Sequence, residues 1–164
     1  MDEVRALTVR PPWSHLIAFC GKTVENRPRP MRYRGQLAIH AGLTWDSAAE
    51  SSPTAVVAWR RWADSLPPPN IAGRLRRDAL HVTFGAVVAV AEVAGCHHSG
   101  ECMPDGVHGC SPWAIRGQWH IVLAGVRPLG EPVPCTGRLG LWKLPADAGK
   151  AVRDQLEVTG DVPR

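Results

Sequence analysis

The sequence contains no run of apolar residues close to the roughly 20 that a membrane-spanning helix requires, and 21% of its residues are charged. The N-terminal residues include acids and lack the apolar stretch of a secretory signal. The five cysteines are odd in number, which is not typical of a disulfide framework. We therefore expect a globular protein in the cytoplasm with reduced thiols and no contact with a membrane.

Several motifs of nucleotide-dependent and hydrolytic enzymes are also missing. The sequence has no glycine-rich phosphate loop, no nucleophile elbow and no internal repeat. At 164 residues the chain is long enough for one core and too short for two independent ones. We expect one domain over residues 1–158, with a helical insert at about 44–80 and a frayed tail at 159–164.

The local patterns predict strands separated by short helices, without the regular alternation of a doubly wound sheet. The helices are expected to begin at Pro12, at Thr44 and Ser52, and at Pro145. The strands are expected at residues 3–9, 32–41, 82–95, 119–126 and 139–144, with a proline-rich loop between the last two. This pattern favours an α+β fold built on a small mixed β-barrel.

The excess of positive charge lies entirely in the first quarter of the chain. Residues 1–40 carry seven Lys or Arg against three acids, a balance of +4, and the net charge of the whole chain is also +4. Four of the arginines lie between Gly21 and Gly42, where Pro28 and Pro30 favour an extended backbone without a hydrogen-bonded ladder. This asymmetry indicates a polyanionic partner such as phosphate.

Residues 13–27 (WSHLIAFCGKTVENR) resemble the helix and the G-x-K-x-x-E-x-R motif of the ASCH-domain family. Three later segments follow in the order expected of that family: RYRGQLAIHA at 32–41, CSPWA at 110–114 and PVPCTGRLGLWKLP at 132–145. The resemblance implies a PUA-like pseudo-barrel flanked by short helices, a fold shared with domains that grip RNA or hold modified bases. It also implies a cleft beside the barrel into which the motif loop projects.

The family resemblance leaves the activity open, because a shared fold does not fix function. The family contains proposed RNA-binding coactivator domains, a ribonuclease-like member and an amidohydrolase that deacylates N4-acetylcytidine. We expect a nucleic-acid-binding module, for RNA rather than DNA or for a modified nucleoside, without a cofactor. The alternatives are a small hydrolase in the same cleft, acting as an amidohydrolase or a metal-independent ribonuclease, and an adaptor that binds a protein partner through its tryptophans.

The candidate catalytic residues are Lys22, Glu25 and Glu92. A lysine near a helix end can attack an amide carbonyl, and a carboxylate within an apolar strand such as residues 82–95 can protonate the leaving amine. In the amidohydrolase members the resemblance implies a nucleophilic lysine at the Lys22 position and a threonine near the Glu25 position. The alternative for Lys22 and Glu25 is an ion pair that shapes the cleft without reacting.

The candidate nucleic-acid contacts combine cations for phosphates with side chains that face bases. We expect Leu37 and Ile39 to be buried and His40 to point to the opposite face, so that His40 and Glu92 form the floor of the cleft. Trp45 and Trp113 lie at predicted turns and are the better stacking candidates among seven tryptophans. The full set is Arg10, Trp13, Lys22, Arg27, Arg29, Arg32, Arg34, His40, Trp45, Ser111 and Trp113.

Cysteine and histidine residues gather between residues 96 and 110. Thiolate and imidazole are zinc ligands, but the cysteine spacings do not match a compact C-x-x-C knuckle. We therefore expect a reduced loop near the mouth of the cleft and no metal. The residues concerned are Cys96, His97, His98, Cys102, His108 and Cys110.

Overall fold

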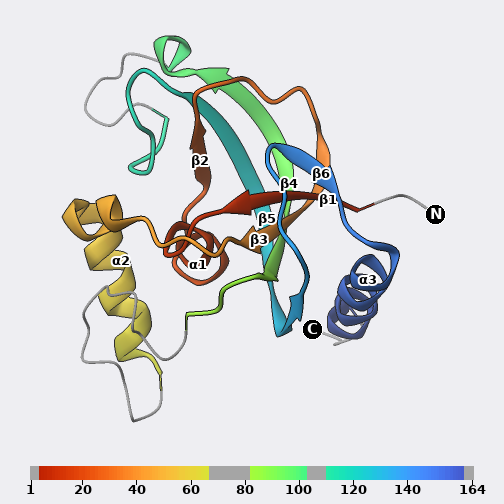
Figure 1. The fold of residues 1–164 in the computed structure, drawn as a ribbon. Helices are drawn as coiled ribbons and strands as arrows, with labels where there is room; N and C mark the ends of the chain where they lie inside the picture. Colours follow the sequence, from red (N-terminus) through yellow and green to blue (C-terminus); the bar gives the residue numbers. More distant parts are fainter. Residues whose placement is uncertain (1–3, 67–81, 103–109, 161–164) are drawn as a thin grey trace.

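The computed structural model describes residues 4–66, 82–102 and 110–160. Within them, eleven elements form one curved sheet and the helices and turns around it (Figure 1). They are β1 (Arg5–Val9), α1 (Trp13–Phe19), β2 (Val24–Arg27), β3 (Gly35–Ala41), the 3-10 turn η1 (Ser47–Ser51), α2 (Pro53–Asp64), β4 (Ala86–His98), the 3-10 turn η2 (Ser99–Glu101), β5 (Trp119–Pro134), β6 (Leu141–Lys143) and α3 (Ala146–Gly160). The α+β fold class expected from the sequence is confirmed.

The six strands form a single half-barrel sheet in the order β2-β5-β4-β3-β1-β6. Only the β1–β3 pair is parallel, and the other four pairs are antiparallel. Because β1 and β3 are parallel neighbours, the chain between them must cross from one end of the sheet to the other. That crossover contains α1, the edge strand β2 and the arginine-rich segment, so the motif residues lie in β2 or directly before it (Figure 1).

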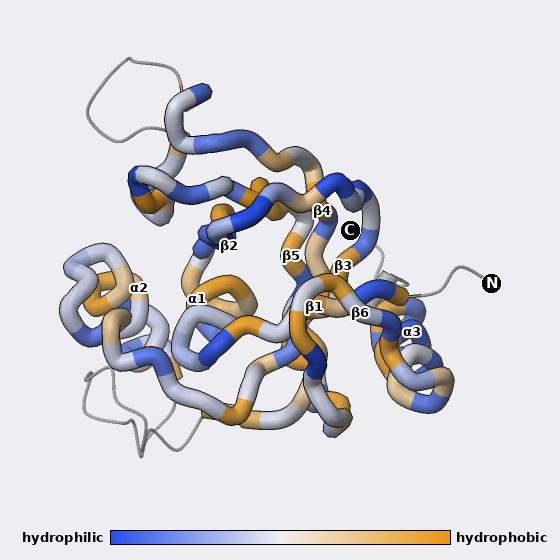
Figure 2. Tube along the Cα trace, turned by 45° about the horizontal axis from the view of Figure 1, so that its top comes forward, coloured by the Kyte–Doolittle hydropathy of each residue, from blue (hydrophilic) through white to orange (hydrophobic). Residues whose placement is uncertain are grey.

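Both faces of the sheet are covered. On one face, α1 packs with Leu37 and Ile39 of β3. On the other face, α3 packs through Ala148, Val152 and Leu156. A separate cluster around Trp59 of α2 lies on the α1 side and includes Leu16 of α1. Figure 2 shows apolar segments along β1, β3 and β4, whereas the connection that follows β2 is strongly hydrophilic. The polar connection therefore lies outside the two apolar layers.

Two predictions about strands were wrong. The segment after α1 is not free of ladder hydrogen bonds, because residues 24–27 precede the prolines, retain their backbone N–H groups and pair with residues 119–122 of β5. The proline-rich loop is instead part of β5, which continues to Pro134 beside β4. Prolines are tolerated there because β2 pairs with β5 only at residues 119–122, and the later part is an edge strand.

The predicted helical insert is only partly described. The helix beginning after Ser52 is α2, and the Ser52 side chain accepts a hydrogen bond from the Ala55 N–H as its cap. Residues 67–81 lie outside the described residues. The predicted tail begins inside α3, which continues to Gly160, and residues 161–164 are not described. Among the described helices, none has the length and apolar character needed to cross a membrane.

Candidate nucleic-acid interface

The end of α1 directs the Lys22 side chain into the protein. Gly21 has a φ of 71°, a left-handed conformation that glycine adopts without a steric penalty. The Lys22 N–H then donates to the Leu16 carbonyl at 3.0 Å. As a result Lys22 is 2% exposed, although it follows a surface helix end.

Lys22 belongs to a chain of charged side chains in which Lys22 and Glu25 are buried and Arg27 is partly exposed. Its Nζ donates to the Val24 carbonyl and forms an ion pair with Oε2 of Glu25 at 3.0 Å. The other carboxylate oxygen of Glu25 accepts from Nε of Arg27, also at 3.0 Å, and Arg27 donates further to the Thr8 carbonyl at 2.8 Å. Two cations therefore share one carboxylate, and every partner lies on β1 or β2 or beside them.

The aromatic side of this network is Trp13, which begins α1. The Lys22 Nζ lies 5.7 Å from the centroid of the Trp13 ring, within the range of a cation–π contact. The indole N–H of Trp13 donates to Oδ2 of Asp46 at 3.0 Å, and Asp46 caps η1. Trp13 is thus engaged on its face and at its nitrogen, which fits a packing role.

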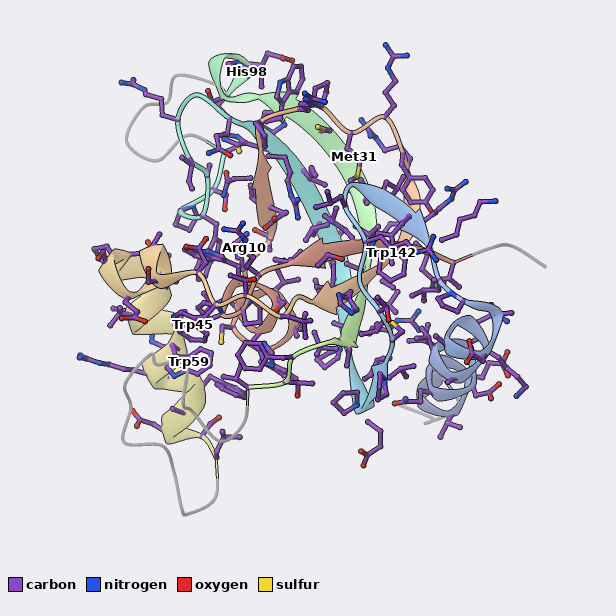
Figure 3. All side chains as sticks on the ribbon, viewed as in Figure 1. Arg10, Met31, Trp45, Trp59, His98 and Trp142 are labelled. Carbon is purple, nitrogen blue, oxygen red and sulfur yellow. The ribbon has the colours of Figure 1, made fainter. Side chains whose placement is uncertain are left out.

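A pocket of about 410 Å³ opens beside the network, on the side of the arginine-rich connection. Arg27 belongs both to the charge network and to the wall of this pocket. Met31, labelled in Figure 3, lies on the connection after β2 and lines the same pocket as Leu141 of β6. The lining residues are apolar on the sheet side (Leu7, Ile121, Gly140 and Leu141) and mixed on the connection (Arg27, Pro28, Arg29, Pro30, Met31, Arg32 and Tyr33).

The arginines of the connection between β2 and β3 (residues 28–34) differ in their hydrogen bonds. Arg29 and Arg32 are exposed and line the pocket. Arg34 is also exposed, but its guanidinium donates to the carbonyls of Met31 and Tyr33 at 3.0 and 2.8 Å. Arg34 therefore braces the connection, whereas Arg29 and Arg32 present cations at the pocket.

The predicted cleft floor was wrong for both residues. Glu92 is exposed on β4, between the core residues Ala91 and Val93, so its side chain points away from the α1 face. His40 is 1% exposed and lies on the α3 face, where Nε2 is 2.9 Å from the Cys135 carbonyl and the ring meets Trp142 edge-on. Burial lowers the pKa of His40, against the opposing effect of the carbonyl. The alternation of residues along β3 correctly predicted that His40 and Ile39 point to opposite faces of the sheet. Because both faces of the sheet are covered, His40 is nevertheless buried.

The remaining predicted contacts do not line the pocket. Arg10 is exposed at the end of β1, on the side of α1 and α2 in Figure 3. Trp45 and Trp113 pack against the cluster around Trp59, and the Trp45 N–H donates to Glu50 at 2.8 Å. Ser111 is buried, and its Oγ accepts from the Trp113 N–H. Trp45 and Trp113 therefore form a second group beside α2.

Sequence reasoning missed the apolar half of the pocket. Tyr33 and Met31 lie between the arginines, and an aromatic residue within a basic, proline-braced segment was a usable signal for base stacking. Leu7, Ile121 and Leu141 come from β1, β5 and β6, and their meeting depends on the sheet order. Asn26 was also missed: its side chain bonds the Trp113 carbonyl and the Ile115 N–H, each at 2.8 Å.

The six-stranded half-barrel sheet with helices on both faces is an α+β fold. The crystal structure of an ASCH protein from Zymomonas mobilis matches with a TM-score of 0.52 and 11% identity, covering 93% of this chain and 94% of the other. A mutant of that protein gives a TM-score of 0.49 and 11% identity over 93% and 98% of the chains. No protein-family model and no curated protein matches the sequence. The first likeness shows an ASCH-like fold, as the motif resemblance implied.

Proposed function

We propose that this protein binds single-stranded RNA or a modified nucleotide in the pocket between β1, β6 and the arginine-rich connection. The observation that supports this best is the lining: apolar walls beside Tyr33, with Arg27, Arg29 and Arg32 on the connection. A volume of about 410 Å³ is within the range of small-molecule sites. An apolar wall suits the face of a base, and guanidinium groups suit phosphate oxygens.

The likeness to the ASCH protein supports the fold on which the proposal rests and says nothing about a ligand. The preference for RNA over DNA comes from the family resemblance and is part of the proposal. All five cysteines are free, which is compatible with the reducing cytoplasm in which we propose that the protein works.

The most direct test compares two pairs of exposed arginines. Arg29→Ala/Arg32→Ala removes cations from the pocket, whereas Arg60→Ala/Arg61→Ala removes the same charge from α2. Fluorescence anisotropy with a labelled single-stranded RNA, and with DNA of the same sequence, should show weakened binding for the first pair and nearly unchanged binding for the second. Equal effects of both pairs would indicate a general charge effect and contradict the pocket. Absence of salt-sensitive binding in the wild type would favour a protein partner.

Hydrolysis is the second candidate, favoured by the contact between Lys22 and Glu25 in the motif. The Lys22 Nζ is engaged by Glu25 and the Val24 carbonyl, and Lys22 does not line the described pocket. A substrate carbonyl would therefore reach Nζ only after this contact opens. Incubation with N4-acetylcytidine and with single-stranded RNA, with and without chelator, tests both hydrolytic reactions. Product formation that is lost in Lys22→Ala would favour the enzyme, and binding without product would favour the module.

A further inference from the structure

Four metal-ligating side chains meet where β4 ends and β5 begins. His97 near the end of β4 and His120 near the start of β5 are direct partners across the ladder. Cys102 follows η2, and Cys110 precedes the turn that leads back to β5. One nitrogen or sulfur atom from each of the four residues lies within 4.8 Å of all the others.

The distances agree with a shared tetrahedral ion. His97 Nε2 is 3.2 Å from the Cys110 sulfur and 3.3 Å from the Cys102 sulfur, and His120 Nδ1 is 3.3 Å from each sulfur. Zinc bonds of about 2.3 Å to sulfur and 2.0–2.1 Å to nitrogen give a nitrogen–sulfur edge of about 3.5 Å in a tetrahedron. The four ligand atoms therefore need to separate by only a few tenths of an ångström to hold the ion.

Hydrogen bonding alone does not account for these four contacts. The Nε2 of His120 is 2.9 Å from the Ile115 carbonyl, and because a carbonyl only accepts, this nitrogen carries the ring proton. In the neutral imidazole, Nδ1 is then an unprotonated acceptor that faces both sulfurs. Two thiols supply two protons and His97 at most one more, which is fewer than four contacts. A cation among the four atoms satisfies all of them.

The surroundings resemble those of a structural metal site. The bond from His120 to the Ile115 carbonyl fixes the ring orientation, as is usual for histidines that ligate metals. His120 is 2% exposed. Two sulfur and two nitrogen ligands, with no carboxylate among the four, favour zinc over magnesium or calcium. Four protein ligands leave no open position for a substrate or water.

We propose that His97, Cys102, Cys110 and His120 bind one zinc ion that fixes the segment after Cys110 against β2. This segment contains Trp113 and Ile115, which are bonded to Asn26 next to Glu25. The ion joins the β4–β5 ladder to both ends of the connection between Cys102 and Cys110. The pairing of β4 with β5 places His120, ten residues beyond Cys110, beside His97. The four ligands therefore come together without the short spacing of a C-x-x-C knuckle. His98, by contrast, caps η2 through Nδ1, and His108 is not among the described residues.

The test measures bound metal in the full chain, purified without chelator. Elemental analysis should find about one zinc per chain in the wild type, since structural sites bind zinc tightly. Cys102→Ser and His120→Asn should lose it. Cys135→Ser, a thiol outside the four, and His98→Gln, the neighbour of a ligand, should retain it. Replacement with Co²⁺ should give the thiolate charge-transfer and tetrahedral absorption bands of a mixed cysteine and histidine site.

Chelation of the wild-type protein tests the metal site even if a variant fails to fold. Removing the metal should lower the melting temperature, and adding zinc back should restore it. Three results would overturn the proposal: no metal in the wild type and no cobalt bands, equal zinc content in Cys102→Ser and Cys135→Ser, or a disulfide between Cys102 and Cys110 in a thiol count. Iron in place of zinc would overturn the choice of ion.

Discussion

Glu25 is the residue whose removal should destabilise the motif most. Its side chain is 10% exposed and accepts from two cations, Lys22 and Arg27. Glu25→Gln keeps the shape but removes the charge, which leaves the ammonium of Lys22, 2% exposed, without a carboxylate and with neutral acceptors such as the Val24 carbonyl. Breaking a buried pair from one side costs about 3–5 kcal/mol, because the other charge stays buried without compensation. We therefore expect a loss of about that size in the free energy of unfolding.

Removal of the lysine should lower the free energy of unfolding by less than removal of Glu25. Lys22→Met leaves Glu25 paired with Nε of Arg27 at 3.0 Å, so no isolated charge remains. The double variant Lys22→Met/Glu25→Gln removes the buried charge pair and should recover part of the loss. A matched surface control is Asp154→Asn, which breaks the exposed Lys150–Asp154 pair and should change stability by less than about 1 kcal/mol.

Urea unfolding and thermal melting measure these differences. For a chain of this length, about 1 kcal/mol corresponds to a shift of about 2–4 °C in Tm. Glu25→Gln should therefore melt at least about 6 °C below the wild type. The reasoning would be refuted if Glu25→Gln cost no more than Asp154→Asn, or if Lys22→Met cost more than Glu25→Gln.

Three further predictions concern pH, salt and metal. Burial lowers the pKa of His15 from 6.5 to about 4, so below pH 6.5 the unfolded chain takes up a proton that the folded chain does not. The free energy of unfolding should fall by about 3 kcal/mol between pH 6.5 and 4 in urea titrations, and His15→Gln should remove that part of the slope; an unchanged slope would contradict the assignment. Each phosphate contact with a single strand contributes about 0.7 to the slope of log K against the logarithm of salt concentration, so Arg29→Ala/Arg32→Ala should reduce that slope by about 1.4. A slope equal to that of the wild type would show that the phosphates bind elsewhere. Chelator should lower the Tm of the wild type but not that of Cys102→Ser, and equal shifts would indicate another metal site.

Local patterns predicted the elements that local chemistry determines. Pro12 and Gly21 bracket α1, Ser52 caps α2, and the alternation of Leu37 and Ile39 with His40 gave the correct faces of β3. The G-x-K-x-x-E-x-R spacing also brought Lys22, Glu25 and Arg27 into contact. In these cases the determining interactions lie within about seven residues of one another.

What the sequence did not predict depends on partners distant in the chain. The pairing of β2 with β5 joins residues about one hundred positions apart, and nothing within residues 24–27 identifies that partner. Glu92 was assigned to the floor of the cleft because it interrupts an apolar strand, but alternation in a strand also exposes single residues among buried ones to solvent. His120 was absent from the predicted cysteine and histidine cluster because only the β4–β5 register places it beside His97.

Photo-crosslinking tests the central claim, that the pocket beside the arginine-rich connection holds a base. Single-stranded RNA containing 4-thiouridine would be irradiated with the full chain, and the modified peptides mapped by mass spectrometry. The account predicts crosslinks within residues 28–33, at Met31 or Tyr33, that are reduced in Arg29→Ala/Arg32→Ala. Crosslinks confined to Trp45 or Trp113 near α2, with none in residues 28–33, would contradict it.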